Sequence, residues 1–192
     1  MNRIGKIERK TNETNISVEI NLDGTGKYEI NTPIPFFSHM LELLAKTSAM
    51  DVSVKVSGDL EHHMIEDTGI ALGQTLKQAI GTKEGIQRYG FFLLPMDECL
   101  AQCAIDWCNR STLVFKCKFK YEKVEGMSTD LIEHFFKSLS ENASMTINLQ
   151  LLEGDNEHHK AEALFKAFGK ALRMAMQKDP NLKGIPSTKG TI

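Results

Sequence analysis

The sequence predicts an α+β protein made of two equivalent half-domains, and an internal repeat is the main reason. Residues 58–78 read GDLEHHMIEDTGIALGQTLKQ, and residues 154–174 read GDNEHHKAEALFKAFGKALRM. Both segments carry Glu-His-His-x-x-Glu, and both continue with apolar residues at helical spacing. All six histidines fall inside the two units, one near the start of each unit and a pair near its middle. A repeat on this scale indicates duplicated structural units.

Each unit shows the same order of predicted elements, which is three strands, a helix, a strand and a second helix. A sheet with one apolar face and two amphipathic helices cannot bury its helices alone, so each unit must pack against its twin. The expected architecture therefore has the helices packed between two four-stranded sheets. We expect a first half-repeat at residues 1–84, a second at 85–180 and a C-terminal tail at 181–192.

The first unit opens with residues that alternate between apolar and polar from Ile16 to Leu22, as in a half-buried strand. The Asp23-Gly24 pair, with Gly26 close behind, is typical of a hairpin turn and leads to a strand at 28–30. The rest of the unit is predicted as a helix at 35–49 carrying His39, a strand at 52–56 and the first His-His helix, which ends near Gly81.

The second unit repeats this order. Its predicted elements are strands at about 87–94, 98–107 and 112–121, a helix at 129–142 carrying His134, a strand at 145–151 and the second His-His helix, which Asp179-Pro180 stops.

Composition excludes several classes of protein. The chain has 192 residues and a formal net charge of -2, with a pI near 6.3, so electrostatics do not support nucleic acid as a partner. No apolar run of about 18 residues occurs, and the polar amino terminus has no hydrophobic signal segment, which predicts a cytoplasmic protein without a membrane partner. The four cysteines lack CxxC spacing and are interpreted as reduced packing residues: Cys99, Cys103, Cys108 and Cys117.

The paired histidines are the strongest candidate metal ligands. His62 and Glu66 are four residues apart and lie on one helix face, as do His158 and Glu162. The adjacent histidines are rotated by about 100° on a helix of roughly 3.6 residues per turn, which predicts that they serve different metals. The full candidate set is His39, His62, His63, Glu66, His134, His158, His159 and Glu162.

Divided between two metals, these groups provide three imidazoles and one carboxylate each. A six-coordinate metal would keep two positions for substrate and water, and Mn²⁺, Fe²⁺ and Co²⁺ all suit such ligands. A second group of residues indicates that the protein holds an anion, because ammonium, guanidinium and hydroxyl groups grip phosphate. These residues are Arg88, Arg110, Lys166, Ser187 and Lys189.

Seven segments of the chain resemble one enzyme family in order and spacing. The segments are Arg9-Lys10-Thr11-Asn12-Glu13-Thr14, Phe37-Ser38-His39-Met40-Leu41, His62-His63-x-x-Glu66-Asp67, Pro95-Met96-Asp97-Glu98, Glu133-His134-Phe135-Phe136, His158-His159-x-x-Glu162-Ala163-x-Phe165-Lys166-Ala167 and Pro186-Ser187-Thr188-Lys189-Gly190. Along nearly its whole length the chain is similar to the imidazoleglycerol-phosphate dehydratases of histidine biosynthesis.

The resemblance implies two half-domains like domain 2 of ribosomal protein S5, and a shell of 24 subunits with active sites between subunits. It implies two Mn²⁺ ions per active site, held by the eight candidate ligands, and a monofunctional hydro-lyase that converts D-erythro-imidazoleglycerol phosphate into imidazole-acetol phosphate. The implied route passes through a metal-stabilised imidazolate and a diazafulvene. Substrate binding would use Glu13, His39, Arg88, Arg110, Lys166, Ser187 and Lys189.

The implied acid-base residue is Glu13, and the rivals are a metal-bound water and the ligating carboxylates Glu66 and Glu162. The chain departs from the family in a loop about three residues shorter before His62, in Ser38 and Leu43, and in Asn109-Arg110-Ser111 where Gly-Arg-Pro is usual. Two other functions stay open: a dimetal hydrolase with a bridging hydroxide, and a metal-binding shell protein without turnover.

Overall fold

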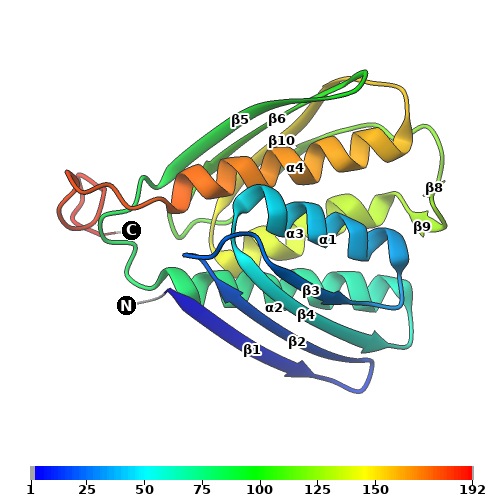
Figure 1. Ribbon diagram of the computed structural model, residues 1–192, viewed down its shortest axis with the longest axis horizontal. Helices are drawn as coiled ribbons and strands as arrows, with labels where there is room; N and C mark the ends of the chain where they lie inside the picture. The colour runs from blue at the N-terminus through cyan, green and yellow to red at the C-terminus, as the bar shows by residue number, and fades with distance from the viewer. Residues whose placement is uncertain (1–2, 192) are drawn as a thin grey trace.

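The computed structural model describes residues 3–191 and shows two four-stranded sheets with four helices between them (Figure 1). This is the α+β architecture that the repeat predicts. The first unit contains β1 (Ile4–Lys10), β2 (Thr14–Asn21), β3 (Tyr28–Asn31), α1 (Pro35–Ser48), β4 (Asp51–Gly58) and α2 (Glu61–Ile80). The second contains β5 (Tyr89–Met96), β6 (Cys99–Asp106), β7 (Thr112–Lys116), β8 (Lys123–Val124), β9 (Met127–Ser128), α3 (Asp130–Ala143), β10 (Thr146–Glu153) and α4 (Glu157–Met176).

The two large sheets have the same topology, which confirms the duplication. Their strand orders are β1-β2-β4-β3 and β5-β6-β10-β7. In each sheet the last pair in this order is parallel and the other neighbours are antiparallel. The parallel pairs arise because α1 joins β3 to β4 and α3 joins β7 to β10, and a helical crossover returns the chain in the same direction.

The predicted hairpin between the second and third strands is wrong. β4 lies between β2 and β3, so these two strands are not neighbours. The turn is instead held by Asp51 of β4, whose Oδ1 accepts hydrogen bonds from the backbone N–H groups of Thr25 at 2.8 Å and Lys27 at 2.9 Å. The Asp-Gly signal marked a real turn, but the crossover through α1 decided which strands pair.

The strand predicted at 112–121 is also too long, because β7 ends at Lys116. Beyond Lys116, two buried side chains of α4 form hydrogen bonds with backbone groups that would pair with a neighbouring strand if β7 continued. Glu157 accepts a hydrogen bond from the backbone N–H of Lys120 at 3.2 Å, and Lys160 donates to the carbonyl of Lys118 at 3.3 Å. The chain then forms the small β8–β9 hairpin, which the sequence reading missed.

Helices from the two units interlock in the core. α2 and α4 each cover their own sheet, whereas α1 packs on α4 and α3 packs on α2. The aromatic rings of Phe37 and Phe135, from different units, meet edge to face with centroids 5.4 Å apart. Because α1 and α3 each pack on a helix of the other unit, residues that are distant in sequence can meet at the ends of these helices.

The cysteines behave as predicted. All four are free, and three are buried. Burial raises the pKa of Cys117 to about 12, and burial with a hydrogen bond to Glu98 raises that of Cys99 to about 12. Among residues 3–191, no helix has the length and apolar character needed to cross a bilayer.

Two equivalent glycines allow the first strand of each unit to cross its last helix. A Cβ on Gly90 would lie 1.9 Å from the carbonyl oxygen of Ala171, and one on Gly5 would lie 2.3 Å from that of Thr75. We expect Gly90→Ala to lower the free energy of unfolding by about 2–3 kcal/mol, since the backbone must move apart. Thermal and urea unfolding measure this, with the exposed Lys6→Ala as control; a Gly90→Ala protein as stable as the control would contradict the close crossing.

Candidate metal centres and anion-binding pocket

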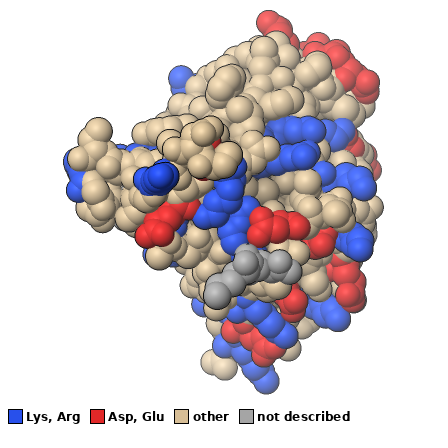
Figure 2. All heavy atoms as spheres, turned by 60° about the vertical axis from the view of Figure 1, so that its left-hand side comes forward, with Lys and Arg blue, Asp and Glu red and all other residues tan. Residues whose placement is uncertain are grey.

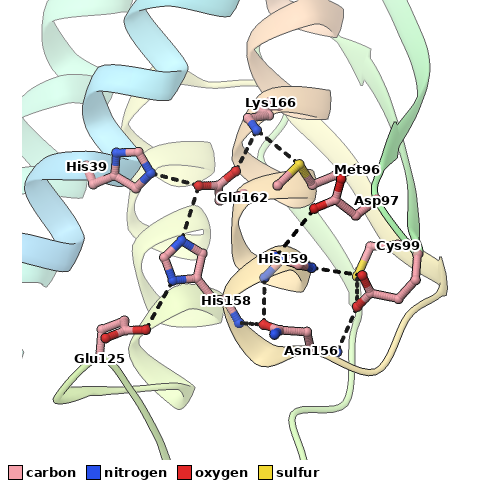
Figure 3. Close-up of polar contacts among 11 residues, drawn as sticks. His39, Met96, Asp97, Cys99, Glu125, Asn156, His158, His159, Glu162 and Lys166 are labelled. Atoms are coloured by element: carbon pink, nitrogen blue, oxygen red, sulfur yellow. Dashed lines mark hydrogen bonds and ion pairs between the residues drawn. The ribbon is translucent and has the colours of Figure 1, made fainter.

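The first cluster joins the two units through His39 of α1 and His158 and Glu162 of α4. Glu162 Oε1 lies 2.7 Å from His39 Nε2 and 3.2 Å from His158 Nε2. Figure 3 shows the three side chains pointing toward one another. Their ligand atoms all lie within 4.8 Å of one another, so one metal ion can contact all three. The sequence placed His158 beside Glu162, but only the packing of α1 on α4 adds His39.

Glu162 is held as an anion. Burial by itself would raise the pKa of Glu162, but hydrogen bonds from Lys166 and His39 lower it to about 2. Lys166 Nζ lies 2.5 Å from Glu162 Oε2 and 3.2 Å from Met96 Sδ. Glu125 of the β8–β9 turn lies 3.2 Å from the Nδ1 atom of His158 and directs the other ring nitrogen into the cluster.

The second cluster is the counterpart of the first, with His62 and Glu66 of α2 and His134 of α3. Glu66 Oε1 lies 3.4 Å from His134 Nε2, and Glu66 Oε2 lies 3.6 Å from His62 Nε2. The imidazole rings of His62 and His134 have centroids 4.6 Å apart.

His134 Nε2 provides a test of whether a metal fits. This nitrogen is buried and has no hydrogen-bond partner among residues 3–191, a costly arrangement for a polar atom unless a ligand completes it. Its neighbours are a carboxylate and a second imidazole, which are donors to a divalent transition metal. The donor set of this cluster therefore fits a metal ion.

His63 and His159 lie outside both clusters. His63 Nδ1 is 2.9 Å from Asp59 Oδ1, and His159 Nδ1 is 2.8 Å from Glu98 Oε2. The hydrogen bond that His63 donates to Asp59 raises the pKa of His63, and the one that His159 donates to Glu98 raises the pKa of His159. Within the described part of the single chain, each cluster thus has two imidazoles and one carboxylate, and the expected third imidazole is not among its members.

Glu13 lies in the turn between β1 and β2, at the same end of the molecule. Its Oε2 atom is 3.8 Å from His63 Nδ1, and its side chain is exposed. Glu98 occupies the matching turn between β5 and β6. It also accepts a hydrogen bond from the backbone N–H of Asn156 at 2.9 Å, and with His159 this lowers the pKa of Glu98 to about 2.

A basic pocket of about 560 Å³ lies beside the C-terminal tail. Arg88 donates to the carbonyl of Pro186 at 2.8 Å and, through two nitrogens, to Asp106 at 2.7 and 3.2 Å. In Figure 2, Lys and Arg side chains lie around the protruding C-terminal segment. The pocket is lined by Arg88, Tyr89, Cys108, Arg110, Pro186, Ser187, Thr188, Lys189 and Thr191.

Asp106 does not line the pocket but pairs with its arginines, and sequence reasoning missed it. It pairs with Arg88 at 2.7 Å and lies 3.9 Å from the exposed guanidinium of Arg110. The available signal was an acidic residue at a strand end, four positions before Arg110. Two arginines and Lys189 outnumber this single carboxylate, so the pocket suits an anion.

The metal clusters and the pocket lie at opposite ends of the molecule. All four helices begin at one end, where both clusters are found (Figure 1). The Arg88 backbone N–H bonds to the carbonyl of Ala175 in the last turn of α4, whereas His158 is in the first turn. Seventeen residues at about 1.5 Å each place the two regions ~25 Å apart. Lys166 was predicted to join the anion site, but it lies with the first cluster.

The duplicated α+β fold, with paired imidazole and carboxylate clusters and a basic pocket, defines an enzyme for a small anionic substrate. Comparison with known proteins then identifies the particular family. A family model described as "Imidazoleglycerol-phosphate dehydratase" matches residues 32–172. The chain belongs to the imidazoleglycerol-phosphate dehydratase family, which confirms the resemblance and makes it a hydro-lyase of histidine biosynthesis.

Relatives and solved structures agree with this assignment. An imidazoleglycerol-phosphate dehydratase from Lachnoclostridium phytofermentans is 50% identical over 195 residues, covering 100% of both chains. The histidine biosynthesis bifunctional protein HisB of Spirosoma linguale is 52% identical and covers 99% of this chain, which spans 50% of that protein. The crystal structure of the Staphylococcus aureus dehydratase has a TM-score of 0.85 at 36% identity, covering 92% of this chain and 99% of that one.

Proposed function

We propose that the chain converts D-erythro-imidazoleglycerol phosphate into imidazole-acetol phosphate and water, using two Mn²⁺ ions per active site in a cytoplasmic homo-oligomer of 24 subunits. One observation carries the proposal. Each cluster has two imidazoles and one carboxylate, while His63 and His159 lie outside both clusters with Nδ1 bound to a carboxylate. These two histidines are available to complete clusters on neighbouring chains.

With one such histidine added, each cluster would offer three imidazoles and one carboxylate. A six-coordinate Mn²⁺ ion would then keep two positions for the substrate and water. When bound, the ions supply Lewis acidity that favours the anionic form of the imidazole ring and so assists loss of the neighbouring hydroxyl group. The imidazolate route requires this negative charge on the imidazole ring of the substrate.

Among the three candidate carboxylates, Glu13 fits the proton transfer best. Lys166 and His39 hold Glu162 ionised, with a pKa of about 2, so it is a poor proton carrier near neutral pH. Glu66 lies between two imidazoles of the second cluster and serves as a ligand. Glu13 is exposed and outside both clusters, so it is free to take the proton from the carbon that bears the ring.

The basic pocket would hold the phosphate. Arg88 is oriented by Asp106, while the side chains of Arg110, Ser187 and Lys189 line the same space. A three-carbon substrate cannot span ~25 Å between the pocket and the clusters of one chain, a distance of about seventeen helical residues. The phosphate and the imidazole ring would therefore be bound by different chains.

The direct test is turnover of imidazoleglycerol phosphate by purified protein, before and after metal removal with a chelator. We expect no turnover without metal and recovery on adding Mn²⁺, with ~two metal ions per chain by elemental analysis. Protein that holds the metal but shows no turnover would support a non-catalytic shell protein. Hydrolysis of esters or amides without dehydration would support a dimetal hydrolase.

A further inference from the structure

Lys83 is a buried lysine that the proposed chemistry does not use. It follows α2 in the connection between the two units, and the residue is only 4% exposed. Its ammonium donates to the side-chain oxygen of Asn109 at 2.5 Å, and this acceptor is a neutral amide. Burial, followed by the charge of Lys77, lowers the pKa of Lys83. A lysine is seldom buried without a carboxylate partner, so this arrangement calls for a reason.

Asn109 occupies a special backbone position directly before Arg110. Its φ of 59° lies in the left-handed region, which glycine adopts freely and other residues adopt at a cost. The loop that follows β6 must make this turn to place Arg110 over the pocket. A hydrogen bond to the Asn109 side chain stabilises the turn from the buried side.

Other contacts hold the far side of the same loop. The Thr146 hydroxyl donates to the Arg110 carbonyl at 3.1 Å, and the Ser111 hydroxyl donates to the Glu141 carbonyl at 3.1 Å. On the side before Arg110, the Lys83 ammonium binds the side chain of Asn109. Lys83 therefore couples the connection between the two units to the direction of the Arg110 side chain.

We infer that Lys83 is a positioning residue of the anion pocket, which acts through Asn109 to hold Arg110 in place for a phosphate group. The inference rests on the proposed role of this pocket. It assigns Lys83 no contact with the substrate. Its loss should weaken phosphate binding while leaving the metal clusters, at the other end of the molecule, unchanged.

The test uses the full assembled protein, with inorganic phosphate as the ligand in a binding assay and imidazoleglycerol phosphate in kinetics. Lys83→Met keeps the apolar stem but removes the donor. We expect the phosphate Kd and the substrate KM to rise about tenfold, as for loss of a hydrogen bond to a charged group. kcat and metal content should be retained because the clusters lie at the other end of the molecule, and melting temperature because an apolar side chain of similar volume often replaces a buried charge without loss of stability.

Two changes at Asn109 check the route. Asn109→Ala should weaken phosphate binding as Lys83→Met does, and this exposed position keeps the test open if the lysine variant fails to assemble. Asn109→Gly adopts the left-handed turn without help, so adding Lys83→Met to it should change affinity less than about twofold. Arg110→Ala serves as the reference for complete loss of the arginine.

Two results would overturn the inference and leave the proposed function standing. In the first, the wild-type protein binds phosphate and turns over substrate, and Lys83→Met has the same phosphate Kd and substrate KM. In the second, Lys83→Met weakens phosphate binding as much in the Asn109→Gly background as in the wild-type protein. Wild-type protein that neither binds phosphate nor turns over substrate would overturn the proposed function, and the inference with it.

Discussion

His158→Ala should remove metal from the first cluster and reduce turnover to below about 1% of the wild-type rate. Outer partners of metal ligands typically contribute 10- to 100-fold to metal affinity, and a ligand itself should contribute at least the upper value. His158 shares Glu162 with His39, so the variant leaves His39 as the one imidazole that the chain itself places beside the carboxylate in this cluster. Elemental analysis after desalting and a turnover assay measure both effects.

The same variant also tests whether sites are shared between chains. If a neighbour's histidine completes the cluster, loss of the metal should weaken the assembly, and sedimentation should detect smaller species. Arg173→Ala is the matched control, because Arg173 is exposed near the other end of the same helix. A fully assembled, metal-replete His158→Ala protein would contradict shared metal sites.

Two inactive variants that damage opposite ends of the chain should restore activity when they are assembled together. Glu13→Gln alters the end with the clusters without removing a metal ligand, and by itself it should lower kcat by about 10²- to 10⁴-fold. Arg110→Ala with Lys189→Ala alters the pocket, where both side chains are exposed. Because the ends of one chain lie ~25 Å apart, an intact site can form from the good end of each variant.

Co-assembly of equal amounts should restore up to about a quarter of wild-type turnover, since about one in four random pairs of neighbours joins an intact cluster end to an intact pocket. Glu13→Gln mixed with Glu13→Ala is the control and should restore nothing. Mixed oligomers shown by native mass spectrometry that stay inactive would mean that each active site lies within one chain.

The fold followed largely from local patterns. Alternating residues marked most strands, and apolar spacing marked all four long helices, because these patterns report which face of an element is buried. Local patterns were a poorer guide to which strands pair. The Asp23-Gly24 signal predicted a β2–β3 hairpin, whereas the crossover through α1 places β4 between those strands. β7 ended early because Glu157 and Lys160, distant in sequence, bind its backbone continuation.

In the site, too, local spacing predicted some contacts and long-range packing decided the others. Spacing on one helix paired His62 with Glu66 and His158 with Glu162, since residues four apart share a helix face. No pattern could show that His39 joins His158, because that contact depends on α1 crossing to the other unit's α4. The supporting carboxylates, such as Asp106 beside Arg88, are defined by contacts between strands and loops rather than by spacing.

The sequence by itself determined the duplication, the element types, the family and the set of side chains that can bind metal and phosphate. These properties depend on residue identity and on periods of a few residues, both of which are visible in the sequence. Tertiary structure alone decided that the helices exchange between units, that the clusters each hold two imidazoles, and that the pocket lies at the far end of α4. The reason is physical: burial of two apolar sheets against one shared layer of helices sets long-range distances that no local pattern encodes.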